Sequence, residues 1–227
     1  NVTKTKKFIK ITINNGIKNF IFLSSSNVYS ENVRLFDEGS KTSPKNFYGK
    51  NKLTIEKFLL NKKNKYTNLL ILRLFNVIGL TKKFKPKNFG NYKHQRFLFK
   101  VFYNIKKKLP LEINYIKKIK RKMIFPSRDF VDIRDLCNLI FLFKKLFNSK
   151  NLYNIFNVGR GKSYSLDVIL SMVVGKKNKL LINYNKISKK EYVFTKSIVG
   201  KAKKFYNWRP SISLKKSINS NIKNLII

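Results

Sequence analysis

Apolar residues in this chain alternate between helical spacing and short continuous runs. Residues 1–15 have helical spacing, with Val2, Ile9 and Ile13 on one face, and Asn15-Gly16 predicts the helix end. The run NFIFLSS then predicts a short buried strand. A second helix is predicted at FYGKNKLTIEKFLLNKK and a second buried strand at NLLILRLFN. Because helices alternate with continuous apolar strands, the pattern predicts a parallel sheet in an α/β fold.

The second half of the chain is predicted to be less regular. Residues 80–126 are rich in lysine and read as irregular chain with one helix at RFLFKVFYNIKKK. RDFVDI predicts another strand, and Asp135 is predicted to cap a helix whose apolar face is Leu136, Leu139, Ile140 and Phe143. LYNIFNV predicts a strand, Ser165 precedes a further helix, and a strand at KLLINYN leads to closing helices.

The net charge of +41 comes from 51 Lys and Arg against 10 Asp and Glu. One interpretation is binding to nucleic acid or another polyanion. The other is codon bias, because Lys, Asn, Ile and Phe have AT-rich codons and all four are abundant. The lysines are spread along the whole chain rather than clustered, which favours codon bias. Under either interpretation the surface should attract anions, including a phosphorylated substrate.

The composition argues against disulfides, metal sites, membrane spans and a phosphate-binding loop. A single cysteine, Cys137, allows neither an internal disulfide nor a cysteine zinc site, which suits a reducing cytoplasm. No apolar run reaches the ~20 residues of a membrane span, and no signal peptide is visible. His94, the one histidine, lies among lysines, so we expect no metal site. GRGKS at 159–163 looks like a phosphate-binding loop, but Phe156 stands where that motif needs a glycine.

Candidate chemistry lies where the first predicted strand ends. Ser24, Ser25 and Ser26 follow its apolar residues, and ligands of open α/β sheets collect at the carboxyl ends of strands. Tyr48 and Lys52 are four residues apart near the start of the next helix and therefore share a face. A phenol of pKa ~10 is a poor base at neutral pH, but a nearby ammonium favours the phenolate. A serine, a tyrosine and a lysine arranged in this way could abstract a proton from a hydroxyl.

These residues belong to a larger set of motifs in a fixed order. The set is NVTKT, GIKNFIFLSSSNVYS, FDEGSKTSPKNFYGKNKLTIEKFL, LLILRLFNVIG, SRDFVDIRDL, YNIFNVGRGKSYSL and NWRPSISLKKSI. Through these motifs and their order, the chain resembles the extended short-chain dehydrogenases/reductases of the NAD-dependent epimerase/dehydratase family. The resemblance covers nearly the whole chain. It implies an α/β fold in which a truncated Rossmann-type parallel sheet is joined to a smaller C-terminal substrate-binding domain.

The resemblance also implies the catalytic roles. Ser25 would hydrogen-bond the substrate hydroxyl, with Ser24 and Ser26 beside it. Tyr48 would take the proton of that hydroxyl as hydride passes to NAD. Lys52 would lower the pKa of the tyrosine and hold the nicotinamide ribose, and the backbone of Phe75 would contact the nicotinamide end.

Substrate binding follows from the same resemblance. Asn76 and Arg128 match residues that bind the phosphates of a nucleotide sugar. Asn1 matches an asparagine beside the active site. Ser26, next to Ser25, is also expected to contact the substrate. The resemblance assigns residues 1–79 and 127–160 to the NAD-binding portion. It assigns 80–126 and 161–227 to the nucleotide-sugar-binding domain. The expected partners are NAD and a nucleotide sugar, with no specific nucleic acid and no membrane, and a homodimer is compatible with this reading.

One segment suggests the reaction. Between LPLEI and SRDF the chain carries NYIKKIKRKMIFP, which is longer than the turn of many family members and similar to the insertion of UDP-glucose 4-epimerases. We therefore expect epimerisation at C4 of a UDP-hexose through a transient keto sugar. The alternatives are a dehydratase, reductase or decarboxylase of the same family and a non-catalytic polyanion-binding remnant. Family members begin with a G-x-x-G-x-x-G turn for the NAD pyrophosphate, which the resemblance places before residue 1.

Overall fold

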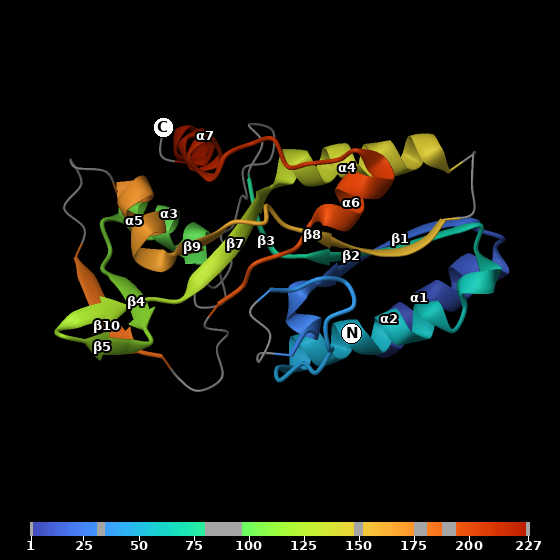
Figure 1. Ribbon diagram of the computed structural model, residues 1–227, viewed down its shortest axis with the longest axis horizontal. Helices are drawn as coiled ribbons and strands as arrows, with labels where there is room; N and C mark the ends of the chain where they lie inside the picture. Colours follow the sequence, from blue (N-terminus) through green and yellow to red (C-terminus); the bar gives the residue numbers. More distant parts are fainter. Residues whose placement is uncertain are drawn as a thin grey trace.

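A parallel three-stranded sheet forms the centre of one lobe of the protein (Figure 1). The computed structural model describes residues 2–30, 35–79, 97–147, 152–174, 181–187 and 194–225. The sheet has the order β1-β2-β8, with β1 at Asn19–Ser25, β2 at Asn68–Leu74 and β8 at Leu152–Val158. Leu70 of β2 lies opposite Ile21 on one side and Asn154 on the other. The predicted strands and their parallel arrangement are thereby confirmed.

Two pairs of helices cover the two faces of this sheet (Figure 1). Helices α1 (Val2–Asn14) and α2 (Phe47–Leu60) pack on one face, where Ile9, Ile55 and Leu59 meet Leu69. Helices α4 (Ile133–Leu146) and α6 (Gly200–Tyr206) pack on the other, in a cluster with Leu70 and Leu72. Successive residues of a strand point to opposite faces, so one fully apolar strand supplies both cores.

The second lobe packs helices against a parallel pair of strands. It contains α3 (Phe97–Lys107), α5 (Leu166–Val174) and α7 (Leu214–Leu225), with β4 (Leu111–Tyr115) beside β10 (Ile182–Lys186). Its core includes Leu98, Val101, Phe102, Ile113, Ile169 and Ile218. Between the lobes runs a small sheet of order β3-β7-β9, formed by Asn76–Ile78, Ser127–Asp132 and Ser163–Ser165.

Residues 111–124 are more regular than their sequence predicts. They form β4 and then an antiparallel hairpin of β5 (Lys117–Ile119) and β6 (Lys122–Ile124). Lys120 and Arg121 make the two-residue turn, both with positive φ. The expectation of irregular chain was therefore wrong over this segment. The hairpin residues are mostly exposed, so no alternation of apolar and polar residues reveals the strands.

The predicted cap of α4 was also wrong. Asp132, not Asp135, caps this helix, and its carboxylate accepts a hydrogen bond from the Arg134 backbone N–H at 2.9 Å. Strand β7 runs directly into the helix, so the helix begins three residues earlier than expected. Asp135 is buried in the first turn, where its carboxylate accepts hydrogen bonds from the backbone N–H groups of Ser211 and Ile212. It therefore anchors the segment that follows α6.

Candidate active site

The three consecutive serines at the end of β1 have different surroundings, although all three are buried. Ser24 directs its hydroxyl to the carboxylate of Glu56, to which it donates a hydrogen bond. Ser25 caps a short 3-10 helix, Ser26–Val28, and its Oγ accepts from the Asn27 backbone N–H at 3.2 Å. In this arrangement the Ser25 hydroxyl can still donate a hydrogen bond to a ligand. The Ser24 hydroxyl instead donates its hydrogen bond to Glu56.

Helix α2 begins in contact with the turn that follows these serines. Asn46 caps the helix, with its Oδ1 accepting from the Gly49 backbone N–H at 2.7 Å. Gly49 approaches Asn27 so closely that a Cβ at this position would lie 2.1 Å from the Asn27 carbonyl oxygen. Only glycine permits that approach. The first turn of α2, which carries Tyr48, is thus held beside the carboxyl end of β1.

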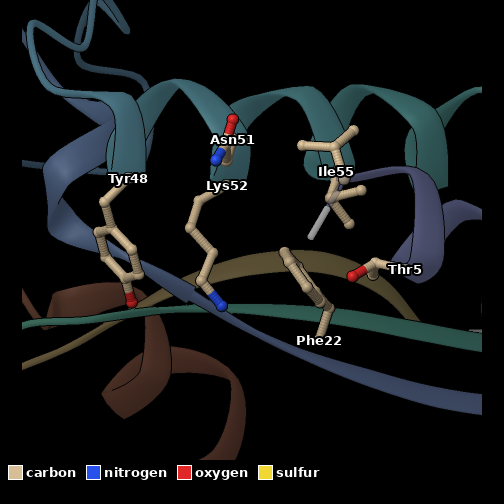
Figure 2. A pocket seen from close by; sticks show the side chains of 7 residues that line it. Thr5, Phe22, Tyr48, Asn51, Lys52 and Ile55 are labelled. Carbon is tan, nitrogen blue, oxygen red and sulfur yellow. The ribbon is translucent and has the colours of Figure 1, made fainter.

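Tyr48 and Lys52 line one pocket of about 260 Å³ between α1, α2 and β1 (Figure 2). Figure 2 shows both side chains descending from α2 toward the sheet. The Lys52 Nζ donates a hydrogen bond to the Leu23 carbonyl oxygen at 2.7 Å. It also lies 4.9 Å from the ring centroid of Phe22 and 5.7 Å from that of Tyr48. The tyrosine is 48% exposed and therefore accessible to a ligand.

Two opposing effects act on the charge of Lys52. Burial lowers the pKa of its ammonium group, because the charged form loses solvation. The carboxylate of Glu56, one helical turn further along α2, acts in the opposite direction. The result is a partly desolvated cation beside the Tyr48 phenol.

The residues expected to bind phosphates lie apart from this pocket, on β3 and β7. The Asn76 side-chain amide donates to the Asp129 carbonyl oxygen at 2.9 Å, which joins it to the residue after Arg128. Arg128 lies opposite Tyr164 of β9, and its Nη1 donates to the Ser127 carbonyl oxygen at 3.1 Å. Neither Asn76 nor Arg128 lines the pocket that the described residues form around Tyr48.

Phe75 and the remaining expected site residues have other surroundings. The Phe75 backbone N–H donates to the Val158 carbonyl oxygen at 3.0 Å, and its ring packs on Phe36. A ligand contact through this backbone would therefore have to use the carbonyl oxygen of Phe75. Ser26 is buried within the 3-10 helix. Asn1 and His94 lie outside the described residues.

The glycine-rich turn after β8 is occupied by a carboxylate of the protein itself. The Asp129 carboxylate accepts hydrogen bonds from the Arg160 and Gly161 backbone N–H groups, at 2.8 and 3.0 Å. It also accepts from both the backbone N–H and the hydroxyl of Ser197. Burial raises the pKa of Asp129, and these hydrogen bonds act against that rise. These two backbone N–H groups of the turn are therefore used within the protein, by Asp129.

Sequence reasoning missed three residues near this site. Thr5 and Asn51 line the pocket together with Tyr48 and Lys52. Glu56 is completely buried behind it. A signal for Glu56 was present, since it is one of only ten acidic residues and lies between the apolar positions Ile55 and Leu59 of a helix. Thr5 and Asn51 carried no comparable signal.

Solved structures of nucleotide-sugar enzymes share this fold. MoeE5 in complex with UDP-glucuronic acid and NAD matches with a TM-score of 0.82 at 20% identity, over 99% of this chain and 70% of that one. A UDP-glucose-4-epimerase from Stenotrophomonas maltophila, with bound NAD and formylated UDP-arabinopyranose, matches with a TM-score of 0.85 at 15% identity, over 99% and 68%. At these identities the likeness establishes the fold, which is of the Rossmann type.

Two comparisons of sequence agree with the structural ones. The bifunctional protein GAL10 of Pachysolen tannophilus is 36% identical over 86 residues, which are 35% of this chain. The matched region spans only 12% of that relative's length. The profile of the NAD dependent epimerase/dehydratase family matches residues 1–159. This match covers more than half of the chain and includes the serines of β1 and the Tyr48–Lys52 helix, so the chain belongs to the NAD-dependent epimerase/dehydratase family.

Proposed function

We propose that this chain carries the proton-transfer site of an NAD-dependent nucleotide-sugar epimerase, acting at C4 of a UDP-hexose. The observation that carries the proposal is the pocket in which Lys52 Nζ lies 5.7 Å from the ring centroid of Tyr48, beside the end of β1. An accessible phenol with a partly desolvated cation on the same helix face can exchange a proton with a bound hydroxyl. The family match and the UDP-sugar ligands of the similar structures support a nucleotide sugar as substrate.

In the proposed mechanism Tyr48 moves the proton. Its phenolate oxygen takes the proton of the sugar hydroxyl when the keto sugar forms and returns it when the sugar is reduced. The Lys52 ammonium stabilises the phenolate, and the Ser25 hydroxyl holds the sugar oxygen in place. NAD, when bound, supplies the acceptor for the hydride that leaves the sugar carbon and later returns to its opposite face. Epimerisation therefore consumes no net cofactor.

The phosphates of the substrate are assigned to the other group of residues. Arg128 offers a guanidinium fork suited to a diphosphate, and Asn76 offers an amide beside it. We assign residues 1–79 and 127–160 to the NAD-binding portion and residues 80–126 and 161–227 to nucleotide-sugar binding, with Asn1 and Ser26 beside the sugar. In this division the hexose would reach from Arg128 toward Tyr48.

The described residues fit one end of NAD. Lys52 places a cation beside the carboxyl end of β1. A nicotinamide ribose could bind there, held by Lys52 and by the Phe75 carbonyl oxygen. The pyrophosphate requires a glycine-rich turn at a helix N-terminus. None of the nine glycines in the sequence forms G-x-x-G-x-x-G, so these residues supply no cradle for it. We therefore expect the 227-residue chain alone to bind NAD weakly.

The test is an assay of the natural full-length protein, with NAD, for interconversion of UDP-glucose and UDP-galactose. Tyr48→Phe should lower kcat by roughly 10²–10⁴-fold, because it removes the proton-transferring group. Tyr184→Phe, an exposed tyrosine of β10, is the matched control and should retain activity. Full turnover by Tyr48→Phe would refute the catalytic assignment. Net NADH formation would instead indicate net oxidation of the sugar rather than epimerisation, and analysis of the sugar product would identify a reductase, dehydratase or decarboxylase.

A second candidate function, polyanion binding without catalysis, is favoured by one surface feature. A shallow hollow of about 480 Å³ is lined by Ser213, Asn219, Ser220 and four cations, namely Arg134, Lys215, Lys216 and Lys223. Salt-sensitive binding of duplex DNA by the natural full-length protein, together with a failure of that protein to bind NAD, would support this function. In that case Lys216→Gln with Lys223→Gln should reduce the salt slope by ~0.9 for each phosphate that the variant no longer neutralises.

Location and assembly complete the proposal. Cys137 is a free, exposed thiol, which suits a reducing cytoplasm. Every helix in the described ranges is too short or too polar to cross a bilayer. We propose a cytoplasmic homodimer, to be tested by fractionation of cells and by sedimentation of the full-length protein.

A further inference from the structure

A buried ionic group ties α2 to two strands behind the pocket. Glu56 is 0% exposed and accepts hydrogen bonds from Arg73 of β2, with Nη2 to Oε2 at 2.8 Å and Nε to both carboxylate oxygens at 3.2 Å. It also accepts a hydrogen bond from the Ser24 hydroxyl of β1. One side chain of α2 therefore holds both strands that approach the site.

The group continues from Arg73 to β8. Arg73 Nη1 donates to the Glu38 carbonyl oxygen at 3.2 Å, and the guanidinium lies 4.8 Å from the ring centroid of Tyr29. The Tyr29 hydroxyl donates to Asn157 Oδ1 at 2.6 Å, and the Asn157 backbone N–H donates to Glu38 Oε1 at 2.8 Å. Glu38 and Tyr29 both contact Arg73, and Asn157 binds both of them, so the position of Arg73 is fixed.

Glu56 and Lys52 hold consecutive residues of the same strand. Lys52 Nζ binds the carbonyl oxygen of Leu23, and Glu56 binds the hydroxyl of Ser24. The next residue is Ser25, the one expected to hold the substrate. A rotation or slide of α2 along β1 would break both contacts and would move Tyr48 relative to Ser25.

Stability alone does not account for a buried ion pair of this kind. Taking both charges out of water costs much of what their attraction returns, and well-packed apolar replacements are often as stable. A role in geometry can account for the pair, because the Nε and Nη2 groups of Arg73 donate side by side to the Glu56 carboxylate and so fix its orientation.

We propose that Glu56 is a positioning residue of the active site: through Ser24 and Arg73 it sets α2 against β1, so that Lys52 and Tyr48 face Ser25. The proposal rests on the proposed function for its catalytic meaning. Glu56 also places a negative charge near Lys52, which opposes the effect of burial on the ammonium group. Of the other ionisable groups here, Tyr48 lines the pocket and Arg73 lies behind Glu56, while β1 carries no ionisable side chain.

The first test is Glu56→Gln in the natural full-length protein. We expect kcat to fall roughly tenfold to a hundredfold, as displaced catalytic groups do, with a much smaller change in KM. The alkaline limit of kcat should move to lower pH, because Lys52 loses the neighbouring carboxylate. The matched control is Glu112→Gln, which removes an exposed carboxylate 3.5 Å from Lys100 and should change neither kcat nor its pH profile.

A second variant separates positioning from folding, because Glu56→Gln leaves Arg73 buried without its counter-charge. Replacing the group together, by Ser24→Ala, Glu56→Leu and Arg73→Met, should give a protein that unfolds cooperatively near the natural temperature. The same loss of kcat in this folded variant is the expected result. A folded variant of either kind with unchanged kcat and pH profile would overturn the proposal.

A third measurement does not depend on turnover. The titration of Lys52 can be followed by NMR of isotope-labelled lysine, with the resonance assigned by Lys52→Arg. In Glu56→Gln, Lys52 should lose its proton at lower pH than in the natural protein. An unchanged titration would overturn the proposal whatever the activity. A shifted titration in a protein without nucleotide-sugar activity would reject the proposed function and leave the placement of Glu56 intact.

Discussion

Gly49 at the start of α2 lies directly against the backbone carbonyl of Asn27, the second residue after Ser25. The contact connects the serine turn to the tyrosine helix without any side chain between them. Gly49→Ala should therefore lower the free energy of unfolding by about 2 kcal/mol or more, because its Cβ would lie 2.1 Å from the Asn27 oxygen. Urea denaturation measures this change. Gly200→Ala, where a Cβ meets nothing within 4 Å, is the control and should be neutral or stabilising.

The neighbouring serines should separate activity from stability. Ser25→Ala should lower kcat roughly 10²–10³-fold, as expected for loss of one hydrogen-bond donor to the reacting oxygen, while costing only about 1 kcal/mol as a lost helix cap. Ser25→Thr should restore much of the activity. Ser24→Ala should instead reduce stability by about 1–3 kcal/mol, because the buried Glu56 loses a donor. Equal kcat losses in the two alanine variants would contradict the different roles assigned to these hydroxyls.

Asp129→Asn should be among the most destabilising conservative changes in the chain. The carboxylate accepts hydrogen bonds from Arg160, Gly161 and Ser197, and an amide group would turn an NH₂ toward some of these donors. We expect a loss of about 3 kcal/mol or more, measured by urea denaturation. Asp167→Asn, an exposed aspartate in the first turn of α5, should cost less than about 1 kcal/mol. Comparable losses would mean that the Asp129 contacts contribute little.

Tyr29 should remain protonated at unusually high pH. Burial raises its pKa from 10.0 to about 12, although the nearby Arg73 opposes the rise. The folded protein thus holds this proton more tightly than the unfolded chain. The resulting stability is fully present below pH 10 and is lost as the pH rises toward about 12. The difference in tyrosinate absorbance between the natural protein and Tyr29→Phe should rise near pH 12, and a rise near pH 10 would contradict the burial effect.

The sequence predicted those parts of the site that depend on local spacing. Tyr48 and Lys52 share a pocket because residues four apart lie on one face of any helix. The apolar runs around Ile21 and Leu70 predicted buried strands because their composition excludes solvent on both faces. Partners distant along the chain could not be predicted in this way. Glu56 meets Arg73 and Ser24 only after two strands and a helix have packed together.

Other errors arose where polar residues form regular structure. Asp132 and Asp135 both stand near the start of α4, and composition alone does not distinguish the cap from the residue that holds Ser211. The β5–β6 hairpin has no apolar face toward the core, so its strands depend on pairing with each other. The grouping of Asn76 with Arg128 on adjacent strands came from family resemblance, and spacing alone did not indicate it.

The β5–β6 hairpin gives the high lysine content a structural consequence. Its register places Lys117 opposite Ile124, Lys118 opposite Met123, and Lys122 opposite Ile119, so no two lysines face each other across the strands. A slip of one residue toward the turn would bring Lys118 opposite Lys122, a destabilising pair of like charges. The positive charge that attracts anions to the surface thus also disfavours this slipped register. High salt would weaken that discrimination between registers while leaving every backbone hydrogen bond of the hairpin in place.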